Sequence, residues 1–147
     1  MTRVAVSRLI NATPETVFDA VCNIENLPAT NPDVVGIEFL TEQKSGAGTR
    51  FRETRRMKDK EMVTELEVTE WTHGRHARMV ADSHGTVWDT VFSVEPKGDQ
   101  TELRLVMDAR AHAFLPKLLN PLMKGFFRKG MDGHLTHVKA YCEGQPG

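Results

Sequence analysis

The chain has 147 residues, 27% of them charged, and a formal net charge of −1. This length is typical of one domain with a sizeable hydrophobic core, and we expect a single domain over residues 1–147. The nearly balanced charge gives no overall indication of a nucleic-acid or membrane partner, and no apolar run is long enough to span a bilayer.

The first thirty residues predict one strand followed by two short helices. Residues 3–10 (RVAVSRLI) are rich in the β-branched and aliphatic side chains typical of a strand. Thr13 is expected to cap a helix that begins at Pro14, because a proline at the first helical position loses no hydrogen bond. Apolar residues then recur at helical spacing, and a second helical turn is expected over residues 24–27.

The middle of the chain predicts an antiparallel meander. Six strands are expected near residues 34–41, 48–57, 62–71, 75–82, 86–95 and 101–110, separated by turn-forming sequences such as SHG and PKGD. Side chains alternate between the two faces of a strand, so the residues on each face can be predicted. Every hairpin then places its apolar residues on the same face of the sheet. That face is predicted to hold Met62, Thr64, Leu66, Val68, Ala77, Met79, Ala81, Trp88, Thr90, Phe92, Val94, Leu103, Leu105, Met107 and Ala109.

A two-residue turn at Asp59 and Lys60 is predicted to join the second and third of these strands. The resulting cross-strand pairs are Phe51 with Val68, Glu53 with Leu66, and Arg55 with Thr64. Glu53 and Arg55 then lie on the apolar face, where charge is costly unless it is paired. Two interpretations stay open: a polar anchor inside a cavity, or an Arg55 that reaches water while Glu53 meets a hydroxyl such as that of Thr64.

Residues 114–143 predict a long amphipathic helix that covers the apolar face of the sheet. A helical wheel separates its apolar residues into two stripes that differ by about 100°. The first stripe is Leu115, Leu118, Leu119, Leu122 and Phe126, and the second is Phe127, Met131, Leu135 and Val138. A bend between Gly125 and Gly133 is expected to bring both stripes onto the sheet, with the main helix beginning near Pro121.

This order of elements resembles the START-like helix-grip superfamily, and within it the polyketide cyclase/dehydrase and lipid-transport family. The similar stretches are INATPETVFDAVCNIENLPATNPDV, GAGTRF and FSVEPKGDQTELRL. The resemblance implies an α+β helix-grip fold, in which a curved antiparallel sheet of about seven strands wraps around the C-terminal helix and leaves an internal cavity. It also implies that glycines on that helix allow close approach to the sheet or leave room for a ligand.

The resemblance implies binding of a hydrophobic or amphipathic small molecule, such as a lipid, between the sheet and the C-terminal helix, without a cofactor. Flexible methionines in such an interior can adapt to apolar ligands of different shape. His112 is of interest because it lies near the implied cavity mouth, and Phe126 because it precedes the change of stripe. The candidate ligand-binding residues are Glu53, Arg55, Thr64, Met79, Trp88, Thr90, Met107, His112, Phe114, Leu118, Leu122 and Phe126.

Two other functions stay open. A polyketide cyclase or dehydratase would use Glu53, Arg55 or His112 as acid or base groups. A toxin-like or ribosome-associated interaction module would act through a macromolecular partner. The sequence assigns no catalytic residue, because no GxSxG motif is present and the only tyrosine, Tyr141, lies at the far end of the last helix.

Metal and nucleic-acid binding are not predicted. His134 and His137, like His73 and His76, match no strong metal spacing and are expected to face solvent. The cations of RFRETRRMKDK face an acidic strand, which favours cross-strand pairing over nucleic-acid binding. Two cysteines and the lack of an apolar N-terminal segment indicate a reducing, cytoplasmic compartment without stable membrane insertion, and a homodimer stays open.

Overall fold

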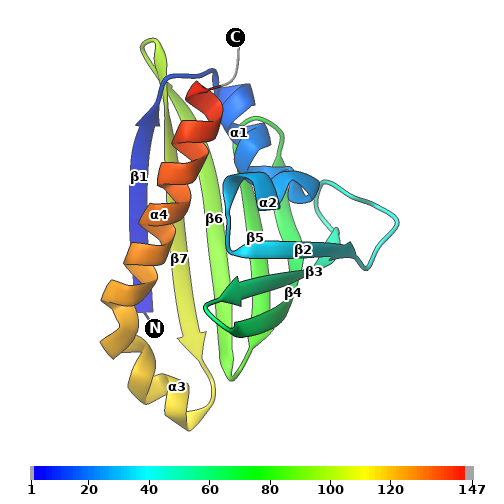
Figure 1. Ribbon diagram of the computed structural model, residues 1–147, viewed down its shortest axis with the longest axis vertical. Helices are drawn as coiled ribbons and strands as arrows, with labels where there is room; N and C mark the ends of the chain where they lie inside the picture. Colours follow the sequence, from blue (N-terminus) through cyan, green and yellow to red (C-terminus); the bar gives the residue numbers. More distant parts are fainter. Residues whose placement is uncertain (1, 145–147) are drawn as a thin grey trace.

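The computed structural model describes residues 2–144, which form a seven-stranded antiparallel sheet with helices on its concave side (Figure 1). The strands are β1 (Thr2–Ile10), β2 (Val34–Phe39), β3 (Arg50–Met57), β4 (Lys60–Thr72), β5 (His76–Ser83), β6 (Thr86–Lys97) and β7 (Gln100–Ala111). The helices are α1 (Pro14–Cys22), α2 (Leu27–Thr30), α3 (Phe114–Leu119) and α4 (Lys124–Glu143), with single 3₁₀ turns η1 (Ile24–Asn26) and η2 (Asn120–Met123).

The sheet order is β1-β7-β6-β5-β4-β3-β2, so strands β2 to β7 form a meander and β1 joins its far edge beside β7. The helix α4 runs along the concave side near β1 and β7, while β2, β3 and β4 curl around to form the opposite wall (Figure 1). This arrangement confirms the predicted α+β helix-grip fold.

The N-terminal elements form as the sequence predicts. The side chain of Thr13 accepts a hydrogen bond from the backbone N–H of Thr16 (3.2 Å), and Pro14 begins α1. The apolar face of α1 is buried against the second half of α4 and one end of the sheet. The core at this end includes Val17, Phe18, Ile24, Phe51, Val68, Leu103, Leu135 and Val138.

The predicted pairing of the last three strands is confirmed. Trp88 lies between Ala81 on β5 and Ala109 on β7. Met79 pairs with Thr90 in the same way, and Val87 and Asp89 point to the convex face. The apolar faces of these strands therefore meet on the side that α4 covers.

The predicted register between β3 and β4 is wrong by two residues. The turn is Lys58–Asp59, with Lys58 in the left-handed region (φ 58°), so Met57 and Lys60 form the closing pair. The observed pairs are Phe51 with Leu66, Glu53 with Thr64, and Arg55 with Met62. A shift of two residues keeps every side chain on its face, so Glu53 and Arg55 remain on the concave side as predicted.

The first predicted stripe of the C-terminal helix does not pack against the sheet. Its residues are exposed: Leu115 60%, Leu118 58%, Leu119 39%, Leu122 79% and Phe126 61%, together with Phe114 at 82%. The cause is the interruption at η2, where Pro121 has no N–H to continue the helix. The chain therefore turns, and α3 lies beyond the end of β7 (Figure 1). The second stripe packs as predicted, because Leu135 and Val138 are buried and Met131 lies against the core.

The glycines of α4 do not mark a close approach to the sheet. A Cβ atom built on Gly125, Gly130 or Gly133 would meet nothing within 4 Å. Gly85 in the β5–β6 turn is different, because its φ is +81° and a Cβ there would lie 2.5 Å from the Cβ of Ala113. The carbonyl oxygen of Gly85 also accepts a hydrogen bond from the N–H of His112 (2.8 Å), which fixes this turn against the start of α3.

Candidate functional site

The concave face is closed at one end of the sheet and partly open at the other. Along β6, Phe92 is buried whereas Trp88 and Thr90 are only half-buried. Along β4, Val68 is buried whereas Met62 is 41% exposed. We call the half-open part the concave site. It comprises Glu53, Arg55, Met62, Thr64, Trp88, Thr90, Met107 and His134.

A charge pair lies on the β3 side of the concave site. The carboxylate of Glu53 is buried, and its Oε1 accepts a hydrogen bond of 2.5 Å from Nε of Arg55. This pairing makes the buried charge tolerable. The side chain of Arg55 is 41% exposed, and its terminal NH₂ groups have no hydrogen-bond partner among the side chains and backbone described for residues 2–144. Arg55 therefore retains donors that a bound molecule can reach.

His134 places a buried polar atom on the α4 side of the site. Within the described part of the chain, its Nε2 is buried without a hydrogen-bond partner. Burial, and then the charges of Arg55 and His137, lower the pKa of His134 from 6.5 to about 4. The imidazole is therefore neutral at neutral pH. An unsatisfied buried nitrogen costs free energy unless a ligand or water completes its bonding.

The expectation that His134 faces solvent is wrong, whereas His137 is exposed as predicted. A sequence signal for His134 existed. It follows Met131 by three residues and precedes Val138 by four, which puts all three on one helical face. His134 therefore lies on the same helical face as the second apolar stripe.

Apolar side chains form the wall between these polar groups. The ring of Trp88 packs edge-to-face on Phe127 of α4, with 5.2 Å between the ring centroids. Met107 is half-buried beside Thr90, with which it pairs across β6 and β7. Met79 is buried below them in the core. The site thus joins an apolar surface to a polar end at β3 and α4.

Six of the candidate residues lie outside the concave site, and one of them is Met79, which is buried in the core. Nε2 of His112 is 2.8 Å from Oδ1 of Asp82. Asp82 alternates with the inward-facing Ala81, so this pair lies on the outer side of the sheet. Phe114, Leu118, Leu122 and Phe126 project into solvent from α3, η2 and the start of α4.

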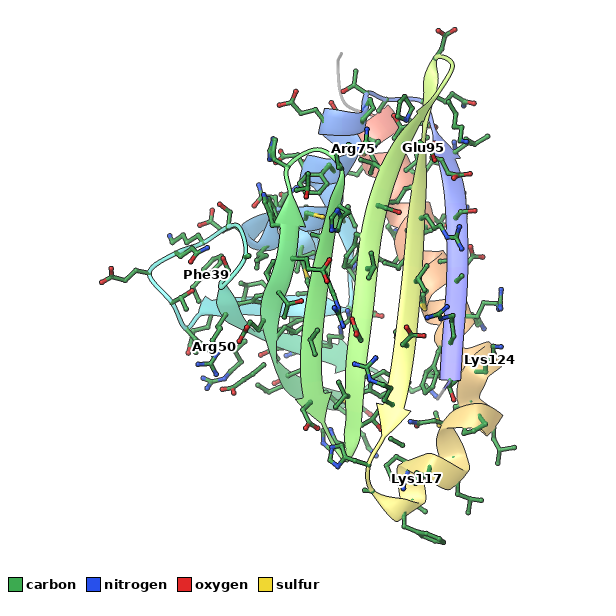
Figure 2. All side chains as sticks on the ribbon, turned by 180° about the vertical axis from the view of Figure 1, so that it is seen from behind. Phe39, Arg50, Arg75, Glu95, Lys117 and Lys124 are labelled. Carbon is green, nitrogen blue, oxygen red and sulfur yellow. The ribbon has the colours of Figure 1, made fainter. Side chains whose placement is uncertain are left out.

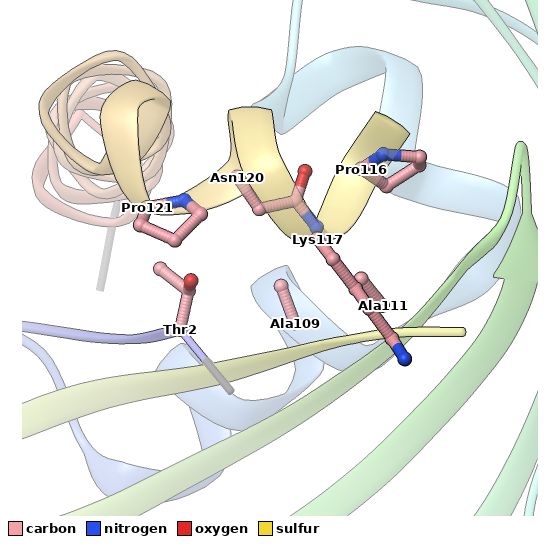
Figure 3. Close-up of a pocket in the computed structure, with 7 residues that line it drawn as sticks. All are labelled: Thr2, Ala109, Ala111, Pro116, Lys117, Asn120 and Pro121. Carbon is pink, nitrogen blue, oxygen red and sulfur yellow. The ribbon is translucent and has the colours of Figure 1, made fainter. Parts of the chain in front are cut away.

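A separate small pocket of about 190 Å³ lies between the sheet edge and the α3–η2 segment. Thr2 of β1 and Ala109 of β7 face Asn120 and Pro121 across it (Figure 3). Its volume is below the roughly 300–1,000 Å³ usual for pockets that hold drug-sized ligands. Another pocket, of about 340 Å³, lies at the end of α1 beside Trp71 and Lys44.

The remaining reactive groups are the metal-binding residue types and the two cysteines. Within residues 2–144, no three His, Cys, Asp or Glu side chains lie close enough to hold a metal ion. Burial raises the pKa of Cys22, and burial together with Glu143 raises that of Cys142 to about 11, so both remain thiols at neutral pH. Neither cysteine is therefore an activated nucleophile.

The basic residues on the outer face of β3 pair with acidic neighbours, as predicted. Arg52 donates to Glu65 (2.8 Å) and to Glu38 (3.0 Å). Arg56 donates to Glu61 (2.6 Å). These exposed pairs form a charged, solvated face.

A family model described as polyketide cyclase / dehydrase and lipid transport matches residues 1–143. A search of curated proteins finds no match. A START superfamily protein from Mycobacterium smegmatis superposes with a TM-score of 0.81 at 18% identity, covering 97% of this chain and 98% of that one. The protein TTHA0849 from Thermus thermophilus gives 0.76 at 21% identity, covering 93% and 94%.

A third similar structure is the di-domain ARO/CYC BexL from the BE-7585A biosynthetic pathway. Its TM-score is 0.72 at 14% identity, and the match covers 95% of this chain and 45% of BexL. Identities this low establish the shared fold alone. No helix within residues 2–144 has the length and apolar character needed to cross a membrane.

Proposed function

The chain belongs to the polyketide cyclase / dehydrase and lipid transport family, and on that basis we propose that it binds a hydrophobic or amphipathic small molecule in the concave site. The apolar part of the ligand lies between the sheet and α4, and its polar end lies at Glu53, Arg55 and His134. The observation that carries this proposal is the unpartnered, buried Nε2 of His134 within electrostatic reach of Arg55.

The half-buried apolar wall supports the apolar part of the proposal. Trp88, Met107 and Met131 remain partly accessible although they face the interior of the fold. Covering such surface stabilises a complex by roughly 2.5 kcal/mol per 100 Å² of apolar area. Two of the three side chains are methionines, whose flexibility suits ligands of varied shape.

The polar groups favour a particular kind of headgroup. Arg55 offers hydrogen-bond donors, but its charge is already balanced by Glu53 at 2.5 Å. His134 is neutral and offers one buried nitrogen. A neutral oxygen-bearing group, such as a hydroxyl or ketone, therefore complements the site better than a carboxylate, which would add an uncompensated charge.

The same groups argue against acid–base catalysis as the main activity. An efficient general base has a pKa near the working pH. The pKa of His134, about 4, makes its imidazole a weak base and keeps it from carrying the more acidic proton of an imidazolium at neutral pH. We therefore place binding ahead of cyclase or dehydratase activity for this chain.

The test uses a retained ligand and a defined probe. Native mass spectrometry of the freshly purified protein is expected to show an added mass. In a Trp71→Phe variant, Trp88 is the only tryptophan left and reports on the concave site. Titration with decanol is expected to shift its fluorescence saturably, and with higher affinity than decanoic acid.

Arg55 and Arg56 provide a matched pair of variants on one strand, since Arg55 faces the concave side and Arg56 faces solvent. Arg55→Met is expected to change decanol affinity by about fivefold, the scale of one hydrogen bond. Arg56→Met should leave it unchanged. A mass spectrum without added mass, together with no saturable response to either probe, would contradict the proposal.

A further inference from the structure

A continuous set of large apolar side chains is exposed at one end of the molecule. We call it the C-terminal apolar surface. It consists of Phe114, Leu115, Leu118, Leu119, Leu122, Met123 and Phe126, which are between 39% and 82% exposed. None of the six side chains of α3 is buried. Folded monomers rarely expose apolar side chains in such numbers side by side, and surfaces of this kind mark sites of association.

The same segment is strongly cationic, although the whole chain is not. Between Asp108 and Asp132 the sequence contains no acidic residue. Lys117, Lys124, Arg128 and Lys129 lie in this interval. Figure 2 places Lys117 and Lys124 at this end of the molecule, and both side chains are exposed.

These cations have no ionic partner in the part of the chain that the structure describes. The two carboxylates of α4 are already engaged, Asp132 with Arg8 (2.5 Å) and Glu143 with Lys139 (2.6 Å). Several cations elsewhere on the surface are paired, for example Arg52 with Glu65 at 2.8 Å. The positive charge at this end is therefore available to an external anion.

We propose that the C-terminal apolar surface docks reversibly on an anionic lipid bilayer. Leucine and phenylalanine side chains enter the boundary between headgroups and acyl chains, while the lysines and arginine contact the lipid headgroups. Interfacial segments combine apolar and cationic side chains in this way. Anchoring to the sheet keeps the surface in place, because Nδ2 of the buried Asn120 donates to Oγ1 of Thr86 (3.1 Å).

Charge favours a bilayer over a second copy of the chain. A two-fold dimer would place this surface against itself and bring the cations of both copies together without an intervening carboxylate. Anionic lipids supply the missing negative charge. The lipid surface is therefore the occupant that satisfies both the apolar and the charged side chains.

Vesicle flotation tests the proposal with the full chain. We expect the protein to float with vesicles of phosphatidylcholine containing about one third phosphatidylserine. Binding should weaken severalfold on pure phosphatidylcholine, and again at about 0.5 M salt, where charges are screened. Flotation that depends on neither lipid charge nor salt would overturn the role assigned to the cations.

Two double variants separate the apolar and cationic contributions. Leu118→Gln with Leu122→Gln removes apolar area without a change in charge and should lower binding by at least about tenfold. Lys117→Gln with Lys124→Gln should lower binding to anionic vesicles by about tenfold and leave the weak binding to neutral vesicles. All four side chains are exposed, so the variants should fold, which circular dichroism checks.

Matched controls lie at exposed positions elsewhere. Leu9→Gln on β1, and Lys60→Gln with Lys97→Gln at hairpin ends, should float like the wild type. The proposal fails if the wild type does not float or if the test variants float equally well. It also fails if sedimentation shows a dimer that Leu118→Gln with Leu122→Gln dissociates, because the surface would then join two copies of the chain.

Discussion

Asp89 is buried and His134 is half-buried with a buried Nε2 atom, but only the side-chain polar atoms of Asp89 have hydrogen-bond partners within the described residues. The carboxylate of Asp89 lies on the convex face and accepts hydrogen bonds from Arg78 (2.5 and 2.8 Å) and Arg110 (3.0 Å). These contacts, led by Arg78, hold the pKa of Asp89 below its ordinary value. The imidazole of His134 receives no such compensation within residues 2–144. A buried polar group with all its hydrogen bonds made contributes to stability, whereas one without a partner is typical of a binding site for a ligand or water.

The first prediction concerns the pH dependence that His134 imposes on folding. Its pKa in the folded protein, about 4, lies below the ordinary 6.5 because burial disfavours the charged form. Between these values the unfolded chain binds more protons, so the free energy of unfolding falls as the pH falls from about 6.5 to 4. The His134→Leu variant lacks this ionisable group. At about pH 4.5 its free energy of unfolding should therefore have fallen by on the order of 2–3 kcal/mol less than that of the wild type.

Urea unfolding of the wild type and the variant across this pH range measures the difference. The control is His84→Asn, in an exposed turn where φ is 53° and asparagine is tolerated. It should keep the wild-type pH dependence. If the free energy of unfolding of wild type and His134→Leu fell with pH in parallel, the fold would not be holding the imidazole neutral.

At the scale of elements, the sequence predicts the sheet better than the final helix. The hairpins that join β5, β6 and β7 were predictable because each turn sequence and each apolar face allowed one register. The β3–β4 register was not, since two registers that differ by two residues put the same side chains inward. In the C-terminal segment, helical spacing shows which residues share a face. It does not show whether a surface lies opposite that face, as α3 illustrates.

For the candidate site too, the residues on the sheet were easier to predict than those on the C-terminal helix. Alternation along β3 is enough to place Glu53 and Arg55 on the concave side, because residues two positions apart on a regular strand lie on the same face. His134 is not predicted by metal-ligand spacing, because it owes its place in the site to its position on the same helical face as the second stripe. The apolarity of the first stripe predicts an interior position, but apolarity alone does not separate a core from an exposed apolar surface.

The second prediction concerns α4 and tests whether its glycines have a packing role. Gly125 and Gly130 have ordinary helical φ values, and a Cβ on either meets open space. Gly125→Ala and Gly130→Ala should each stabilise the protein by about 0.5–1 kcal/mol, since alanine loses less backbone freedom on folding. Chemical unfolding measures the change.

Gly85→Ala is the contrasting variant, because its φ of +81° and the contact with Ala113 exclude a Cβ without movement. It should destabilise the protein by about 1–3 kcal/mol. A loss of stability in Gly130→Ala would mean that α4 approaches another part of the protein at that residue. A neutral Gly85→Ala would mean that the β5–β6 turn is not fixed to the start of α3.

At the scale of the whole molecule, the two ends of the sheet differ in how tightly they are held. One end is packed between α1 and the second half of α4, where Phe18, Leu135 and Val138 are almost fully buried. The other end carries α3, whose side chains are all at least partly exposed. Local opening is easiest where few apolar contacts hold the backbone. Stability is therefore expected to decline along α4 from its C-terminal to its N-terminal half.

Hydrogen exchange tests this gradient and the proposed binding site together. Backbone amides of β7 near Leu103, and of α4 from Leu135 onward, should exchange slowest, while those of α3 and η2 exchange fastest, because only the former lie in the core. Decanol in the concave site should slow exchange in β3, β4 and residues 127–134 of α4, and leave α3 unchanged. Anionic vesicles should do the reverse, since they cover α3. Protection of α3 equal to that of residues 135–142 in the free protein would contradict the gradient, and a common response to both additives would show that the two proposed surfaces are one.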